Sequence, residues 1–285
     1  MAGGAEARAA MRARFSSKER EPVMTTSWYA WSVPDDELTS DALTADFRIL
    51  QRRRGHRFSL DDLATAWAAA SACPAPRVVL DLGCGIGSVL LMVGWRCREA
   101  RLFGIEAQEA SVELARRNIG LNGLAGRASI EHGDLRDLTG DRGYPPCDLV
   151  TGTPPYLPRG TALLSPDPQR AAARIELRGG VEDYLAAAAR VFAEEGFVVV
   201  CADGRFPARV LKGASEVGLV PVRRLDVFAR AGAGDPLLAV WTLRRRGAGL
   251  AALSHEVIAM RDERGERTEV SLGMRRFFGL EGSSG

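Results

Sequence analysis

Three alternating glycines follow a short apolar run in the segment Asp81-Leu-Gly-Cys-Gly-Ile-Gly87. The run over residues 77–80 contains two valines and is preceded by prolines, which is typical of a buried parallel strand. Helical apolar spacing then continues from Ile86 to Trp95. Glycines at such a turn let the backbone approach a ligand closely, beside the N-terminus of a helix. The segment therefore predicts a strand, a ligand-binding turn and a helix.

The glycine spacing differs from that of dinucleotide-binding proteins. Their fingerprint is G-x-G-x-x-G, whereas here Gly87 comes one residue early and Ser88 occupies the place of the third glycine. This difference favours a nucleoside ligand over NAD. Taken alone, the segment is also compatible with an ordinary glycine-rich turn between a strand and a helix.

Two more predicted strands end at carboxylates. Residues 102–106 form an apolar run that ends in Glu106, where a carboxylate can accept both ribose hydroxyls of an adenosine. A helix predicted over 108–122 separates this run from a strand over 128–131, which leads to Asp134. We interpret Asp134 as a contact to an adenine amino group; taken alone, it is equally well explained as a cap or turn carboxylate.

A stiff loop, Thr153-Pro-Pro-Tyr156, follows the fourth predicted strand over 147–152. In a parallel sheet this loop lies at the carboxyl edge, where ligands bind. Its two prolines lack backbone N–H groups, so the loop carbonyls face outward without competing donors. Tyr156 offers an aromatic face to a planar substrate, and a simple packing role is the alternative.

Together these motifs resemble the class I S-adenosylmethionine-dependent methyltransferases that carry an Asn/Asp-Pro-Pro-Tyr loop. Within that class the chain resembles the bacterial adenine-N6 methyltransferases of valine tRNA, through residues 50–61, the Pro-Pro loop and residues 165–176. The resemblance implies an α/β fold with a Rossmann-like, doubly wound sheet of seven strands. It also implies the strand order 3-2-1-4-5-7-6, in which segments 219–228 and 236–243 form a terminal antiparallel hairpin.

The resemblance implies S-adenosyl-L-methionine as the cofactor and methyl transfer to an exocyclic adenine amino group in RNA, with tRNA favoured. The residues implied to bind the cofactor are Arg57, Phe58, Asp81, Gly83, Cys84, Gly85, Gly87, Glu106, Ala107, Asp134, Leu135 and Thr153. The implied catalytic residues are Thr153, Pro154, Pro155 and Tyr156.

Two positions depart from the family pattern. The family's loop begins with Asn, whose side-chain carbonyl accepts one hydrogen of the target amino group while the first proline carbonyl accepts the other. Thr153 has only a hydroxyl with a shorter reach, and loss of one such acceptor costs about a hundredfold in rate in other enzymes. Ile175 stands where the family often has His.

Three hypotheses therefore stay open. The first is an RNA adenine methyltransferase. The second is a methyltransferase of another planar nitrogen, such as a protein glutamine or a small molecule. The third is a protein that binds S-adenosylmethionine and in which Thr153 has weakened catalysis.

Charge restricts how RNA would be bound. The net charge is only +2, so a local arginine patch must supply affinity for phosphates. The arginines at residues 52–54 and Arg57, which precede the core, are one group of candidate phosphate contacts. The candidate RNA contacts are Tyr156, Arg159, Arg170, Arg174 and Arg178. A solvated face is the alternative for these arginines.

The remaining features indicate a cytoplasmic protein without metal. The five cysteines show no C-x-x-C spacing, which favours reduced thiols, and the three histidines are isolated. No apolar stretch approaches the length of a membrane span. We expect a flexible segment over 1–40, a methyltransferase domain over 41–246, and an extension over 247–285 with a strand and a short helix. The Ala- and Arg-rich start resembles a weak organellar transit peptide, although Glu6, Glu19 and Glu21 argue against one. A disordered tail, or translation from Met24, explains this segment equally well.

Overall fold

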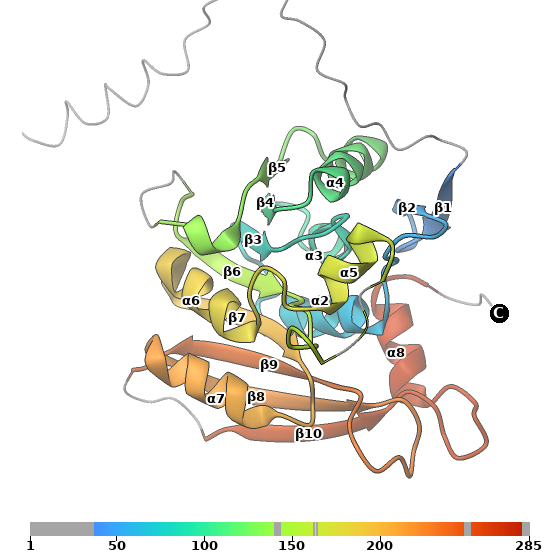
Figure 1. Cartoon of the computed structure of the whole chain (residues 1–285), viewed down its shortest axis with the longest axis vertical. Coiled ribbons are helices and arrows are strands. Elements are labelled where there is room, and N and C mark those ends of the chain that lie inside the picture. The colour runs from blue at the N-terminus through green and yellow to red at the C-terminus, as the bar shows by residue number, and fades with distance from the viewer. Residues whose placement is uncertain (1–36, 140–143, 162, 164, 248–251, 281–285) are drawn as a thin grey trace, which may run out of the picture. The chain divides into compact units, whose positions relative to one another are not determined.

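A mixed sheet forms the centre of the protein in the computed structural model, which describes residues 37–139, 144–161, 163, 165–247 and 252–280 (Figure 1). Its parallel strands are β3 (Val78–Leu82), β4 (Arg101–Glu106), β5 (Ala128–His132), β6 (Cys147–Gly152) and β7 (Phe192–Ala202). Strands β8 (Leu219–Phe228) and β9 (Leu238–Arg245) form the antiparallel hairpin, and β10 (Ser254–Ala259) lies parallel to β8. The sheet order is β10-β8-β9-β7-β6-β3-β4-β5.

The predicted strand order 3-2-1-4-5-7-6 is confirmed for β3 to β9. The predicted number of strands in this sheet is wrong. The sheet has eight strands, because β10 adds to the edge at β8. Glu256 of β10 forms a 2.8 Å ion pair with Arg223, and His255 lies 2.7 Å from Asp226. The sequence indicates a strand near these residues but not its partner, because pairing depends on contacts between distant segments.

Helices cover the two faces of the sheet, each over its own hydrophobic cluster. One cluster lies under α2 (Leu60–Ala72), α3 (Ser88–Arg96), α4 (Glu109–Leu121) and α8 (Glu269–Phe277). The other lies under α6 (Val181–Val191) and α7 (Pro207–Glu216). The helix predicted over 180–195 ends early, because Phe192 already pairs with Cys147 of β6. None of the helices in the described ranges has the length and apolar character needed to cross a bilayer.

Five elements were not predicted: α2, the 3-10 helix η2 (Leu135–Asp137), the short α5 (Pro168–Arg174), and the separate hairpin of β1 (Leu38–Ala42) with β2 (Arg48–Arg52). Helix α2 is rich in alanine and buried on nearly every side, so it lacks the one-sided apolar pattern of a surface helix. The side chain of Asn118 in α4 holds the hairpin, bonding the N–H of Leu50 at 2.7 Å and its carbonyl at 3.1 Å. Strand β1 begins before the domain boundary expected at residue 41, and the predicted transit-like segment lies outside the described residues.

Candidate active site

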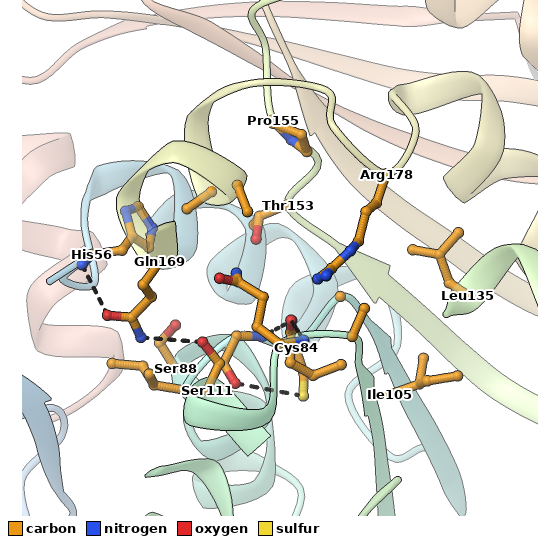
Figure 2. A pocket seen from close by; sticks show the side chains of 18 of the residues that line it. His56, Cys84, Ser88, Ile105, Ser111, Leu135, Thr153, Pro155, Gln169 and Arg178 are labelled. Carbon is orange, nitrogen blue, oxygen red and sulfur yellow. Dashed lines mark hydrogen bonds between the residues drawn. The ribbon is translucent and has the colours of Figure 1, made fainter. Parts of the chain in front are cut away.

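A cavity, here called the central cavity, lies at the carboxyl ends of β3, β4, β5 and β6 (Figure 2). Each strand contributes residues from the loop that follows it, as expected of a doubly wound sheet. The predicted site residues that line the central cavity are Phe58, Gly83, Cys84, Gly85, Glu106, Ala107, Asp134, Leu135, Thr153, Pro155 and Arg178.

The glycine turn presents bare backbone to the central cavity. Gly83 and Gly85 have left-handed φ angles of +57° and +55°, which side-chain-bearing residues rarely adopt. A Cβ on Gly85 would meet no protein atom within 4 Å, so the space beside this residue is open. A Cβ on Gly83 would instead meet the hydroxyl of Tyr184 in α6. The turn therefore packs against Tyr184 at Gly83 and is open to the central cavity at Gly85.

Glu106 is anchored at this turn. Its carboxylate accepts the N–H of Gly85 at 3.0 Å and the N–H of Gln108 at 2.7 Å, and the residue is only 6% exposed. Burial raises the pKa of Glu106, while these backbone hydrogen bonds act in the opposite direction. Each oxygen retains a lone pair, which suits it to accept the two hydroxyls of a ribose.

Asp134 acts as a helix cap and also lines the central cavity. Its carboxylate accepts the N–H of Arg136 at 3.0 Å and forms a 2.6 Å ion pair with the guanidinium of the same residue. These contacts with Arg136 lower the pKa of Asp134. The two interpretations of this residue from the sequence are thus compatible in the structure.

Three predicted cofactor contacts lie outside the central cavity. Asp81 is 2% exposed and accepts the hydroxyl of Thr151 at 2.7 Å, because these two residues pair in register on β3 and β6. Gly87 caps the start of α3. Arg57 forms a 2.9 Å ion pair with Asp41 and lines a second cavity. That these three residues contact the cofactor stays a prediction.

The second cavity, here called the outer cavity, has a volume of about 540 Å³. It is bordered by Pro154, Pro155 and Tyr156 of the Pro-Pro loop. His56, Asp61, Pro155 and Ala173 line both cavities. The two cavities therefore adjoin, and the Pro-Pro loop lies between them.

The side chains of the Pro-Pro loop differ in their surroundings. The Tyr156 hydroxyl lies 2.9 Å from the thiol of Cys201 and donates to Asp61 at 3.5 Å. Burial raises the pKa of Tyr156 well above its usual value. Thr153 extends into the central cavity (Figure 2), and within the described ranges its hydroxyl has no hydrogen-bond partner. Thr153 is thus free to contact a ligand.

The four arginines predicted to contact RNA divide into two groups. Arg170 and Arg174 border the outer cavity, and Arg178 extends toward the central cavity (Figure 2). Their guanidinium groups form no hydrogen bond or ion pair with the part of the chain that the structure describes. The guanidinium of Arg159 instead donates to the carbonyls of Glu176 and Leu177 and lines neither cavity. Arg159 therefore links the Pro-Pro loop to the segment at Glu176 and Leu177.

Several residues at the site were missed by the sequence analysis. Asp61 and Asp62 at the start of α2 line the central cavity, and burial raises the pKa of Asp62 well above its usual range. Gln169 is 4% exposed and bonds the hydroxyl of Ser111 at 3.1 Å. The pattern Ser59-x-x-Asp62 is a capping box and could have located the helix that carries both aspartates.

All five cysteines are free, and four are buried. No group of three or more His, Cys, Asp or Glu residues suited to a metal ion occurs in the described ranges.

The fold and the site together define a class of protein. A family described as a methyltransferase domain matches residues 79–157, which include the glycine turn, Glu106, Asp134 and the Pro-Pro loop. The fold is similar to a solved structure of a predicted O-methyltransferase from Agrobacterium tumefaciens, with a TM-score of 0.57 and 18% identity over 79% of this chain and 100% of that chain. The chain belongs to the class I S-adenosylmethionine-dependent methyltransferases.

Within this class, the chain is similar to curated enzymes that methylate tRNA adenine and to others that methylate protein glutamine. The chain is 30% identical to the tRNA1(Val) (adenine(37)-N6)-methyltransferase of Cronobacter sakazakii, over 60% of this chain and 67% of that enzyme. It is 33% identical to the release factor glutamine methyltransferase of Caulobacter vibrioides, over 54% of this chain and 49% of that enzyme. The chain spans 53% of the length of two further tRNA1(Val) enzymes, from strains of Porphyromonas gingivalis.

Proposed function

We propose that the protein methylates the exocyclic amino group of an adenine in RNA, with tRNA as the substrate. One observation carries this proposal: the central and outer cavities meet at the Pro-Pro loop, and unpaired arginines border the outer one. Such an arrangement suits a base that enters from a polyanion and reaches a methyl donor on the other side of the loop. The similarity to tRNA adenine-N6 methyltransferases supports the same substrate.

The central cavity fits S-adenosylmethionine in the chemistry of its lining. The open space beside Gly85 accepts a ligand against bare backbone, and the Glu106 carboxylate suits the ribose hydroxyls. Asp134 and Leu135 offer an acceptor and an apolar wall to an adenine ring. When bound, the cofactor supplies a methyl group on a positively charged sulfur. The free thiols fit a cytosol-like compartment in which this cofactor is available.

The Pro-Pro loop would orient the target base from the side of the outer cavity. Pro154 contributes a carbonyl without a competing N–H, and Tyr156 contributes a ring whose hydroxyl is held by Cys201 and Asp61. Base stacking on an aromatic ring contributes about 1–3 kcal/mol. Extruding a base from a loop costs a few kcal/mol at most, so this stacking offsets much of that cost.

The arginines at the outer cavity would bind the RNA backbone. Arg170 and Arg174 are exposed and lack protein partners, so their charge is available to phosphates. Arginine binds phosphate in a planar, bidentate manner. Because net charge is only +2, this local group would supply most of the electrostatic attraction.

A second candidate function is methylation of a protein glutamine. Its support is the similarity to a release factor glutamine methyltransferase, and a planar amide would present a similar nitrogen to the loop. The unpaired arginines at the outer cavity favour RNA over a neutral side chain. A protein that binds the cofactor without efficient transfer is the third candidate, because Thr153 lacks the amide carbonyl of Asn.

One assay separates the three candidates. Purified protein is incubated with S-adenosylmethionine carrying a labelled methyl group and either unmodified tRNA or total protein. We expect label in tRNA, found in N6-methyladenosine after digestion to nucleosides. Label confined to protein would contradict the RNA proposal. Cofactor binding by calorimetry without any labelled product would favour the binding protein.

A further inference from the structure

Asp61 occupies a place that no other carboxylate in the described ranges shares, because it lines both the central and the outer cavity. It lies in the first turn of α2, beside the Pro-Pro loop. Its carboxylate accepts the hydroxyl of Ser59 and, at 3.5 Å, the hydroxyl of Tyr156. The side chain is half-buried, and both oxygens retain lone pairs for a further donor.

The other carboxylates of the two cavities are already engaged. Glu106 accepts two backbone N–H groups, at 3.0 and 2.7 Å. Asp134 and Asp203 each form a 2.6 Å ion pair with an arginine two residues away. Asp62 is buried and accepts the N–H of Ser59 at 2.8 Å. Among these groups, only Asp61 is bonded to hydroxyl donors alone.

The Pro-Pro loop lacks an acceptor that the proposed reaction needs. An adenine amino nitrogen has two hydrogens and a lone pair delocalised into the ring, so two acceptors are needed to turn the lone pair toward the methyl carbon. In the proposed function, the carbonyl of Pro154 supplies one acceptor. Thr153 supplies only a hydroxyl, which reaches less far than the amide of Asn.

We propose that Asp61 is a catalytic residue of the proposed methyl transfer. It accepts a hydrogen bond from the target amino group and takes the proton that this group loses, in place of the acceptor missing at Thr153. The inference rests on the proposed function for its acceptor. It adds a role for α2, an element outside the glycine turn and the Pro-Pro loop.

The chemistry of this role balances. Transfer forms a bond between the amino nitrogen and the methyl carbon, and the carbon–sulfur bond breaks with its electron pair left on sulfur. The nitrogen then carries one proton too many. Asp61 receives that proton at a carboxylate oxygen and releases it to solvent after the methylated product leaves. During transfer, its negative charge also stabilises the positive charge that develops on the nitrogen.

The test compares Asp61→Ala and Asp61→Asn with the wild-type chain and with Glu109→Ala. Glu109 is a matched control, because it is an exposed acidic residue in the first turn of α4 and lines neither cavity. We expect Asp61→Ala to lower kcat about a hundredfold. The kcat of Asp61→Asn should lie between those of the wild type and Asp61→Ala, because the Asn amide accepts a hydrogen bond but takes no proton. Cofactor affinity by calorimetry and the melting temperature should match the control.

A second comparison distinguishes a catalytic from a structural role. Adding Thr153→Asn to Asp61→Ala returns an acceptor to the loop and should restore about tenfold in kcat, a part of the hundredfold loss. A merely structural role for Asp61 predicts that Thr153→Asn changes kcat by the same factor in the wild-type chain and in Asp61→Ala.

Three results would overturn the proposal: kcat unchanged in both Asp61 variants, an at least tenfold loss of cofactor affinity with kcat retained, or a wild-type chain that is inactive until Thr153 becomes Asn. Failure of the proposed function looks different, since label then appears in protein instead of RNA. The same variants assayed on that protein acceptor decide the role of Asp61 separately. There, a hundredfold loss in Asp61→Ala supports the role and an unchanged kcat overturns it.

Discussion

The hydroxyl of Thr151 donates a 2.7 Å hydrogen bond to the carboxylate of Asp81, joining the central strands β6 and β3 beneath the glycine turn. The carboxylate is buried at 2% exposure, and burial raises the pKa of Asp81 to about 7. Asp81 therefore links β3 to β6 directly before the glycine turn. Because its carboxylate is buried, ionisation of Asp81 destabilises the fold near neutral pH.

Asp81→Asn should change how stability depends on pH. The folded pKa lies above the unfolded value of 3.8, so the contribution of Asp81 is fully present below about pH 4 and lost as pH rises through 7. Asn does not ionise. The free energy of unfolding of the variant, relative to the wild type, should therefore rise from pH 4 to pH 8 by at most about 4 kcal/mol. Urea unfolding at several pH values measures this difference, and a constant difference would contradict the prediction.

Gly85→Ala should weaken cofactor binding more than it weakens the fold. The new Cβ enters the open space of the central cavity, and φ of +55° adds backbone strain of about 1–2 kcal/mol. Gly218→Ala is the matched control, with φ of +72°, no protein atom near its Cβ and no place in either cavity. We expect at least a tenfold loss of cofactor affinity by calorimetry in Gly85→Ala alone. Equal losses in both variants would mean that strain, and not contact, is responsible.

Glu106→Gln should lower cofactor affinity by about tenfold or more. The carboxylate accepts the N–H of Gly85 and that of Gln108, so an amide group must turn one NH2 toward a backbone N–H. Glu109→Gln, at an exposed position, should leave the affinity unchanged. Calorimetry with S-adenosylmethionine measures both variants, and an unaffected Glu106→Gln variant would remove Glu106 from the binding site.

Arg170→Ala and Arg174→Ala should each weaken binding of tRNA and make it less dependent on salt. Each unpaired guanidinium that contacts a phosphate contributes about one unit to the slope of log K against log salt concentration. Arg77→Ala is the control, because this side chain is 88% exposed and lies before β3, away from the cavities. Filter binding at several salt concentrations measures the slopes. Unchanged slopes for both arginines would contradict an RNA-binding role.

Thr153→Asn should retain or increase methylation of adenine. The side-chain carbonyl of Asn reaches further into the central cavity than the Thr153 hydroxyl, which has no partner among the described residues. Initial rates on unmodified tRNA measure the effect. Gly218→Ala is the control variant, because Gly218 lines neither cavity. A loss of activity in Thr153→Asn would indicate that Thr153 serves a different acceptor.

Much of the site was predictable from local sequence. The glycine turn, the acidic ends of β4 and β5 and the Pro-Pro loop each depend on residues close in the chain, and backbone geometry limits what such short segments can form. The order of seven strands followed from the family resemblance that these motifs carry. Helix α2 escaped prediction because its alanines have no polar face to mark its orientation.

The sequence by itself therefore determined the doubly wound sheet, the cofactor class and the position of the Pro-Pro loop, because strand, turn and helix signals are local. Only the tertiary structure decided which side chains meet at the cavities. Asp81 is not among the residues that line the central cavity and accepts the hydroxyl of Thr151, whereas Asp61 lines both cavities because α2 packs beside a loop ninety-five residues further along the chain. Such contacts depend on the packing of segments that are distant in the chain, and a local sequence pattern does not predict that packing.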